Sequence, residues 1–227
     1  MNIASWFRRL STIALSILLS LTIFSAPANA FITENEQTLR DTNACVSCDL
    51  SGLDLSNKDL YGAVLTGANL SNANLSGSLL VEINLEKATL TGANLSGATL
   101  MGSRLSEANL TEANLSNADL YNALMIKADL TKANLTEADL TSAVISDANL
   151  SKAVVKSAKL QGAILSRSNL VDADFSSSKM RNTRLSNATL TGTNFYAADL
   201  SNSLMPDGTT YNGNVTRFGA ILQEMNP

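Results

Sequence analysis

The chain has 227 residues, enough for one domain or a small pair, and it is rich in leucine, alanine, asparagine, serine and threonine. It contains no histidine, 5% aromatic residues and a formal net charge of −4. That charge has the wrong sign for contacts with nucleic-acid phosphates, so we expect no nucleic-acid partner.

Residues 1–30 have the pattern of a secretory signal peptide. Arg8 and Arg9 form a positive start, an apolar run follows over residues 10–24, and residues 28–30 supply the small side chains that a signal peptidase requires. We expect cleavage after Ala30, export, and no membrane insertion of the mature chain. The alternative is an uncleaved anchor, although the apolar run is shorter than the roughly 20 residues of a membrane-spanning helix.

Residues 31–47 are predicted to cap the N-terminal end of the fold. Thr33 and Glu36 have the spacing of a capping box, which predicts a short helix from about Glu34 to Thr42. Leu39 would then face the core. The alternative interpretation is a flexible leader.

A five-residue unit repeats without a gap over residues 48–202. Its central apolar residue, position i, falls on every residue number divisible by five from Leu50 to Leu200, and 25 of these 31 residues are leucine. Position i−2 is alanine in 21 of the 31 units, and position i+2 is glycine or asparagine in 16. The unit therefore reads Ala-(Asn/Asp)-Leu-(Ser/Thr)-X.

A period of five fits neither regular helix nor strand. Five residues rotate a helix by about 140°, which spreads the leucines around it, and in a strand the successive apolar pairs fall on opposite sides. The chain must therefore turn once per unit. Glycine and asparagine at i+2 agree with this, because both tolerate the left-handed conformation of tight turns.

The unit resembles the A(N/D)LXX motif of the pentapeptide-repeat family over residues 48–202. The resemblance implies an all-β fold, a right-handed quadrilateral β-solenoid with four units per coil, in which i and i−2 point inward and the other positions outward. The 31 units would form about 7.75 coils, each rising about 4.8 Å. The outward positions show the second period, of 20 residues, that coils of four units predict.

That second period aligns an apolar stripe along the solenoid. Position i−1 is polar almost everywhere, yet several residues 20 apart at i−1 are apolar, and apolar residues at i+1 align beside them. Contiguous apolar patches mark interaction sites; the alternative is that the C-terminal segment folds back over part of the stripe. The stripe consists of Tyr61, Val64, Val81, Met101, Tyr121, Leu124, Val144 and Ile164.

Charge is patterned as well. Residues 31–147 hold 15 acidic and 6 basic side chains, whereas residues 148–184 hold 2 and 7, which predicts a basic collar able to dock a charged partner. A column at i+2 alternates strictly in sign and predicts contacts between stacked coils; it consists of Lys87, Glu107, Lys127, Asp147 and Arg167. The collar consists of Lys152, Lys156, Lys159, Lys179, Arg181 and Arg184.

Residues 203–227 are predicted to form a turn followed by a capping helix over about residues 215–225. Pro206-Asp207-Gly208 marks the turn, and Phe218, Ile221, Leu222 and Met225 would share one helix face. Such a cap would cover the unpaired backbone that a solenoid exposes at its end. Homodimerisation through a C-terminal helix, a property of some family members, is the competing interpretation.

Cys45 and Cys48 are the two cysteines of the chain. In the oxidising compartment of an exported protein, a structural disulfide between them is the leading interpretation, with Cys48 inward in the first coil. A reduced, buried pair and a redox-active pair are the alternatives. A closed zinc site is excluded because it needs four ligands.

We therefore expect no catalytic residue, no cofactor and no metal site. The leading hypothesis is an exported, non-catalytic scaffold or protein–protein interaction module, similar to the cyanobacterial and thylakoid-lumen members of the family and located in a thylakoid lumen or periplasm. The first alternative is a DNA-mimic inhibitor of type II topoisomerase, of the quinolone-resistance type. The second is a thiol-redox protein that uses Cys45 and Cys48.

Overall fold

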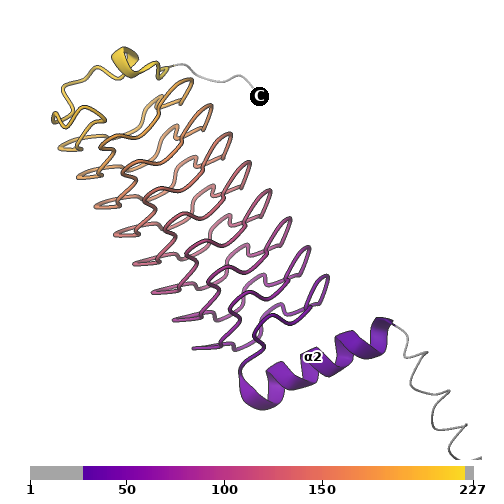
Figure 1. Ribbon diagram of the computed structural model, residues 1–227. Helices are drawn as coiled ribbons and strands as arrows, with labels where there is room; N and C mark the ends of the chain where they lie inside the picture. The colour runs from indigo at the N-terminus through magenta and orange to yellow at the C-terminus, as the bar shows by residue number, and fades with distance from the viewer. Residues whose placement is uncertain (1–27, 223–227) are drawn as a thin grey trace, which may run out of the picture.

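The computed structural model describes residues 28–222, so most of the expected signal segment lies outside the described residues. The described chain forms a straight rod of stacked coils, with helix α2 (Ala28–Thr42) at one end and an irregular C-terminal segment at the other (Figure 1). A short 3-10 helix, η2 (Thr216–Phe218), lies in that segment. Within residues 28–222, no helix is both long and apolar enough to cross a membrane.

The coils are joined by single-residue parallel bridges rather than by long strands. In each unit the residue at i−1 pairs with the residue 20 positions later, from Ala44 with Val64 to Arg184 with Leu204. This offset means that each coil takes four units and that the rod has four faces. We number the faces 1 to 4 by their first central residues, which are Ala44, Asp49, Asp54 and Asp59, respectively.

Positions i and i−2 fill the interior as the periodicity predicts. Leu65 and Ala63, for example, have no exposed surface. The solenoid extends one unit beyond the expected range at each end, because Cys45 and Met205 also occupy buried i positions, with 2% and 0% exposure. Each buried leucine contributes about 1.5–3 kcal/mol, so this single stacked core is the main source of stability.

The turns between units use left-handed backbone at every i+2 position of the coils. Glycine occupies some of these positions, but Glu82 (φ 57°) and Lys152 (φ 59°) adopt the same conformation. The next N–H closes the turn, as where Ala63 donates to the carbonyl of Leu60 at 3.0 Å. Left-handed backbone costs a residue other than glycine about 1–2 kcal/mol, so burial of the neighbouring leucines must hold these turns in place.

Helix α2 covers the open end of the first coil. Leu39 is 3% exposed, Asn35 Nδ2 donates to the carbonyl of Asp49 at 3.1 Å, and Asn43 Nδ2 donates to the carbonyl of Tyr61 at 2.9 Å. The expected helix start at Glu34 is wrong, because α2 begins at Ala28 and includes the position of the supposed capping box. Residues 28–42 contain neither glycine nor proline, so nothing in the segment ends a helix earlier.

The expected helix over residues 215–225 is also wrong within the described residues. After the single turn of η2, Gly219 takes φ 77° and the chain becomes extended. Ile221 then bridges in parallel to Asn194, donating to the carbonyl of Thr193 at 2.8 Å. Extended chain is favoured here because it pairs the free backbone groups of the last coil, which a helix cannot do. Met225 lies outside the described residues.

Candidate interaction surface

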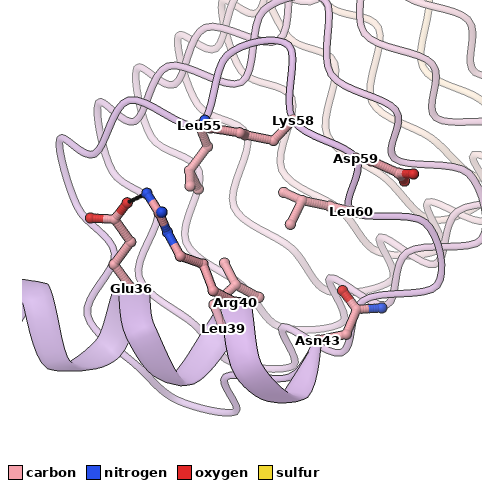
Figure 2. A pocket seen from close by; sticks show the side chains of 8 residues that line it. All are labelled: Glu36, Leu39, Arg40, Asn43, Leu55, Lys58, Asp59 and Leu60. Atoms are coloured by element: carbon pink, nitrogen blue, oxygen red, sulfur yellow. Dashed lines mark hydrogen bonds and ion pairs between the residues drawn. The ribbon is translucent and has the colours of Figure 1, made fainter.

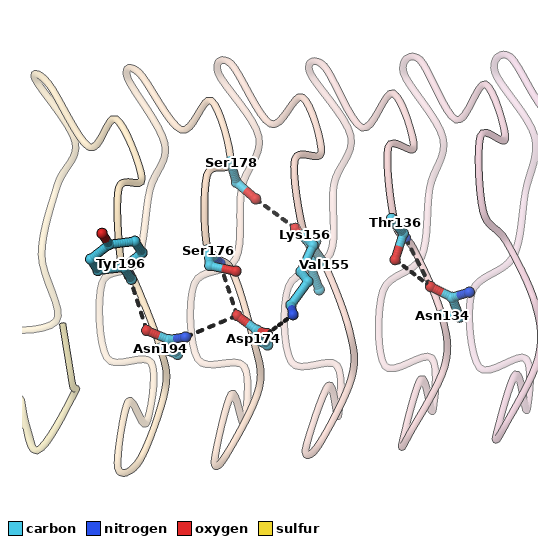
Figure 3. A network of polar contacts seen from close by, with 9 residues as sticks. All are labelled: Asn134, Thr136, Val155, Lys156, Asp174, Ser176, Ser178, Asn194 and Tyr196. Atoms are coloured by element: carbon cyan, nitrogen blue, oxygen red, sulfur yellow. Dashed lines mark hydrogen bonds and ion pairs between the residues drawn. The ribbon is translucent and has the colours of Figure 1, made fainter. Parts of the chain in front are cut away.

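The asparagine and aspartate side chains at i−1 organise the corners of the solenoid. Their Oδ1 atoms accept the backbone N–H two residues later, as where Thr136 donates to Asn134 at 3.1 Å and Ser176 donates to Asp174 at 3.0 Å (Figure 3). These are Asx turns, in which the side chain replaces a backbone acceptor. The residues are therefore structural, although they lie on the outside of the rod.

On face 3 the same side chains also form a ladder between coils. Asn74 Nδ2 donates to Asp54 Oδ1 at 3.1 Å, and Asn94, Asn114 and Asn134 each donate to the residue one coil earlier at 3.2–3.3 Å. All these donors point toward the N-terminal end. The first coil needs only acceptors, which agrees with aspartate at its i−1 positions on faces 2 and 3, where Asn69 and Asn74 of the next coil donate to Asp49 and Asp54.

Val154 interrupts this ladder, and Asp174 restarts it. Asn194 Nδ2 donates to Asp174 Oδ1 at 3.1 Å, while Lys156 Nζ lies 3.3 Å from the other carboxylate oxygen (Figure 3). Asp174 is 3% exposed and its Oδ2 atom accepts no hydrogen bond from a described residue, so the nearby charge of Lys156 is what offsets the burial of this oxygen. On face 3, Asp54 and Asp174 therefore both occupy positions for which the preceding coil offers no acceptor side chain.

The apolar stripe lies on face 1 and on the corner before it. Val64, Leu124, Val144 and Ile164 are central residues of face 1, as the bridges show. Tyr61 is 53% exposed and Leu124 is 39% exposed, whereas Val81, Val144 and Ile164 are half-buried between their neighbours. Two further exposed residues extend the patch on either side, namely Leu79 and Ile126.

The described part of the C-terminal segment leaves the stripe uncovered. Its backbone contacts go to the last coil, where Tyr211 donates to the carbonyl of Ser203 at 2.8 Å and Gly192 donates to the carbonyl of Gly219 at 2.8 Å. Figure 1 shows this segment at the end of the rod. Within residues 203–222, the fold-back alternative is therefore wrong.

Charged side chains border the stripe. The hydroxyl of Tyr61 donates to Glu82 at 3.2 Å, and Arg104 pairs with Glu86 at 2.7 Å. Farther along, Arg167 holds both oxygens of Asp147 at 2.6–2.7 Å, and these hydrogen bonds lower the pKa of the Asp147 carboxyl.

The alternating column at i+2 is only partly paired. Lys87 and Glu107 approach to 3.9 Å, and Asp147 pairs with Arg167. Lys127 has no described carboxylate within 4 Å, and it is exposed.

The basic collar divides into two groups. Lys159 and Lys179 are bridged neighbours on face 4 with Arg181 at the next corner and Arg184 on face 1, whereas Lys152 and Lys156 lie at the corners after faces 2 and 3. Lys156 and Lys159 pair with Asp174 and Asp139 at 3.3 and 3.0 Å, and Arg181 pairs with Asp199. The pKa of Asp199 is lowered to about 2, first by the hydroxyl of Ser201 and then by Arg181. The other three cations have no ion pair with a described residue; they are Lys152, Lys179 and Arg184.

A small pocket lies between α2 and the first coil. Leu39, Leu55 and Leu60 form its floor, and Glu36 and Arg40 pair at its rim (Figure 2). We interpret this pocket as space that remains because helix α2 does not fill the whole cross-section of the four-sided coil that it covers.

The two cysteines form a disulfide, with Cα atoms 5.4 Å apart. Cys45 is the inward residue at position i and is 2% exposed, whereas Cys48 is half-buried, so the expected inward position of Cys48 is only partly met. The bond closes the junction where α2 enters the solenoid.

Comparison with known proteins places this architecture in a family. The family model for pentapeptide repeats, with 8 copies, matches residues 45–80, 68–106, 103–141, 128–167 and 168–205. The chain is a pentapeptide-repeat protein. Its fold is accordingly the right-handed quadrilateral β-solenoid of that family, as the resemblance implied.

Several solved structures are similar to this pentapeptide-repeat protein. HetL, a protein involved in heterocyst differentiation regulation in the cyanobacterium Nostoc sp. strain PCC 7120, is 31% identical over 74% of this chain and 87% of its own, with a TM-score of 0.53. Rfr23 from the cyanobacterium Cyanothece 51142 is 33% identical over 54% and 90%, with a TM-score of 0.37. A protein of the Arabidopsis thaliana thylakoid lumen is 26% identical over 66% and 70%, with a TM-score of 0.19. A search of curated protein sequences found no match.

Proposed function

We propose that this pentapeptide-repeat protein is an exported, non-catalytic interaction module that binds a partner protein on face 1. The observation that carries the proposal is the apolar stripe, which stays open to solvent over several coils beside Tyr61 and Leu124. Soluble proteins rarely expose contiguous apolar surface without using it for binding. The flat, rigid face of a stacked core suits docking without rearrangement.

The titratable side chains support a scaffold role rather than catalysis. Asp147 and Asp139 pair with cations of neighbouring coils, and Asp54 and Asp174 accept the backbone N–H groups of Asx turns. Groups committed in this way hold the coils together. A catalytic group needs instead to converge with others on a substrate.

Export is supported by the signal pattern of residues 1–30 and by the disulfide, which persists in oxidising compartments. Cleavage after Ala30 would remove only the first three residues of α2 and would leave Leu39 in place over the first coil. N-terminal sequencing of the protein from its native host tests this point. A chain that still begins at Met1 would contradict export by cleavage.

The binding surface is tested by affinity capture from the native compartment with Val144→Lys and Val154→Lys variants. Both valines are half-buried central residues, on faces 1 and 3 respectively, so the two changes disturb the solenoid to a similar degree. We expect Val144→Lys to lose the captured partner and Val154→Lys to keep it. Equal retention by both variants would remove face 1 as the binding surface.

A further inference from the structure

We propose that the partner on face 1 is a second copy of this chain, packed face to face with its rod antiparallel to the first. The inference rests on the proposed function only in that it uses the same face, and it names the occupant. It is carried by charged side chains of face 1 and its borders that make no ion pair with a described residue of the same copy.

Symmetry first decides the direction of the second rod. In a parallel pair with a two-fold axis along the rods, each central residue of face 1 would meet its own copy. Arg104 would face Arg104, and Arg184 would face Arg184, which is repulsive. In an antiparallel pair the two-fold axis lies across face 1, perpendicular to the rods. The N-terminal coils of one copy then meet the C-terminal coils of the other, and each corner beside face 1 meets the equivalent corner of the second copy.

The best position of that axis is between the coils of Leu124 and Val144. It places Leu124 opposite Val144 of the second copy, so the apolar centre of face 1 covers itself. One coil further from the axis, Arg104 meets Ile164 of the second copy. The aliphatic part of the Arg104 side chain can pack on Ile164 while its guanidinium group keeps the ion pair with Glu86. The rods then overlap along almost their whole length, because face 1 runs from Ala44 to Leu204.

The alternating column fits this axis. Because the signs alternate from coil to coil, an antiparallel copy centred between two coils presents the opposite sign at the four inner positions, and Lys87 lies opposite the uncharged Asn187. Lys127 would lie opposite Asp147, and Glu107 opposite Arg167. Lys127 makes no ion pair within 4 Å among the described residues, although its charge helps to lower the pKa of Asp147 in the same copy, so the second copy adds a closer partner.

Arg184 gives the second, independent match. It is exposed on face 1 and has no ion pair with a described residue. The same axis places it opposite Asn84 of the second copy, between Glu82 and Glu86. Glu82 is exposed and accepts a hydrogen bond from Tyr61, so it has capacity left for a cation.

At the corner before face 1, the second copy opposes small residues at i+2, Gly102 with Gly162 and Asn122 with Ser142. At i+1 of the same corner, the exposed Met101 and Tyr121 lie opposite Gln161 and Thr141, so a large side chain meets a smaller polar one. A face about 36 Å long and about 15 Å wide gives roughly 500 Å² per copy, close to the lower limit of a specific interface. We therefore expect a weak dimer, with a dissociation constant in the micromolar range.

Sedimentation velocity of the purified protein from about 1 to 200 μM tests the proposal. We expect a reversible dimer, weakened about tenfold or more by Glu82→Arg and by Arg184→Glu, and restored to within about threefold when the two changes are combined. Glu82 and Arg184 lie five coils apart within one copy, so only contact between copies can explain rescue. Lys152→Glu is the matched control, an exposed cation without a described ion pair at the far corner between faces 2 and 3.

Three results would overturn the inference: a monomer at all concentrations, a double variant as weak as the single ones, or a Lys152→Glu variant that weakens the dimer equally. Circular dichroism of each variant shows that the solenoid is intact. If the wild type is monomeric while Val144→Lys still abolishes partner capture, self-association is wrong and face 1 binds a different protein. The two proposals therefore fail separately.

Discussion

Replacing Ser168 by alanine should destabilise the solenoid, whereas the same replacement at Ser103 should stabilise it. Both serines occupy inward i−2 positions and have no exposed surface. The Ser168 hydroxyl donates to the carbonyl of Ile145 at 2.6 Å, and the described coils show no turn N–H on that carbonyl. The Ser103 hydroxyl has no hydrogen-bond partner, and the carbonyl of Leu80, which is the counterpart of the Ile145 carbonyl, accepts the N–H of Ile83 at 3.2 Å.

The size of each effect follows from the buried polar group that is left over. Ser168→Ala leaves the Ile145 carbonyl unpaired, which costs about 1–3 kcal/mol, whereas Ser103→Ala removes an unpaired hydroxyl and should gain about 1 kcal/mol. For a chain of this length, 1 kcal/mol moves Tm by about 2–4 °C.

Thermal unfolding followed by far-ultraviolet circular dichroism, with both variants in one buffer, measures the difference. We expect the two Tm shifts to have opposite signs. Equal shifts in the same direction would show that these hydroxyls act only through their volume, and the hydrogen-bond reasoning would be wrong.

Three further variants test the coil surface. Val154→Asn should raise the free energy of unfolding in urea by about 1 kcal/mol, because the amide regains a partner in the coil below; a loss would show that the valine contributes more by packing. Ala197→Gly should raise the free energy of unfolding by about 0.5–1 kcal/mol, because Ala197 is held at φ 55° and glycine adopts this conformation without strain. The control Ala198→Gly relieves no such strain and should lower the free energy of unfolding in the same urea titration. The Asp199 carboxyl has a pKa of about 2, below its ordinary 3.8, so its contribution to stability is complete above pH 3.8 and disappears as the pH falls through 2. Ser201→Ala should raise that pKa toward 3.8 in a carboxyl NMR titration, and an unchanged value would assign the shift to Arg181 and the backbone N–H of residue 201 instead of the hydroxyl.

The interior could be predicted from the sequence because its rule is almost without exception. Leucine at every fifth residue fixes position i, and outward residues that repeat every 20 positions fix the coil. The first and last units were missed because Cys45 and Met205 stand where leucine is usual, although both are apolar enough to be buried.

The end of the chain could not be predicted in the same way. Phe218, Ile221 and Leu222 have helical spacing, but the nearest binding opportunity is the open edge of the last coil. That edge satisfies the backbone of Ile221 on both sides, through Thr193 and Phe195. Spacing alone carries no information about a partner that exists only once the solenoid has formed.

The candidate surface falls between these two cases. The alignment of Tyr61, Leu124 and their neighbours follows from the period of 20, whereas their exposure depends on where the C-terminal segment lies. The role of asparagine at i−1 was missed, although aspartate at positions 49 and 54, directly before the asparagines at 69 and 74 one coil later, was a visible signal that the first coil differs from the others.

The single direction of the amide ladder has a consequence for how such a rod changes length. Duplicating any 20 consecutive residues around Asn94 would insert a coil whose asparagine finds an acceptor below and a donor above. A coil added before Asp54 would meet a carboxylate that has no hydrogen to give, and the new joint would lack its amide bond. Coils can therefore be inserted within the rod but not before its first coil. The first coil of this run carries the Oδ2 atom of an aspartate at the place where each later coil carries the Nδ2 atom of an asparagine.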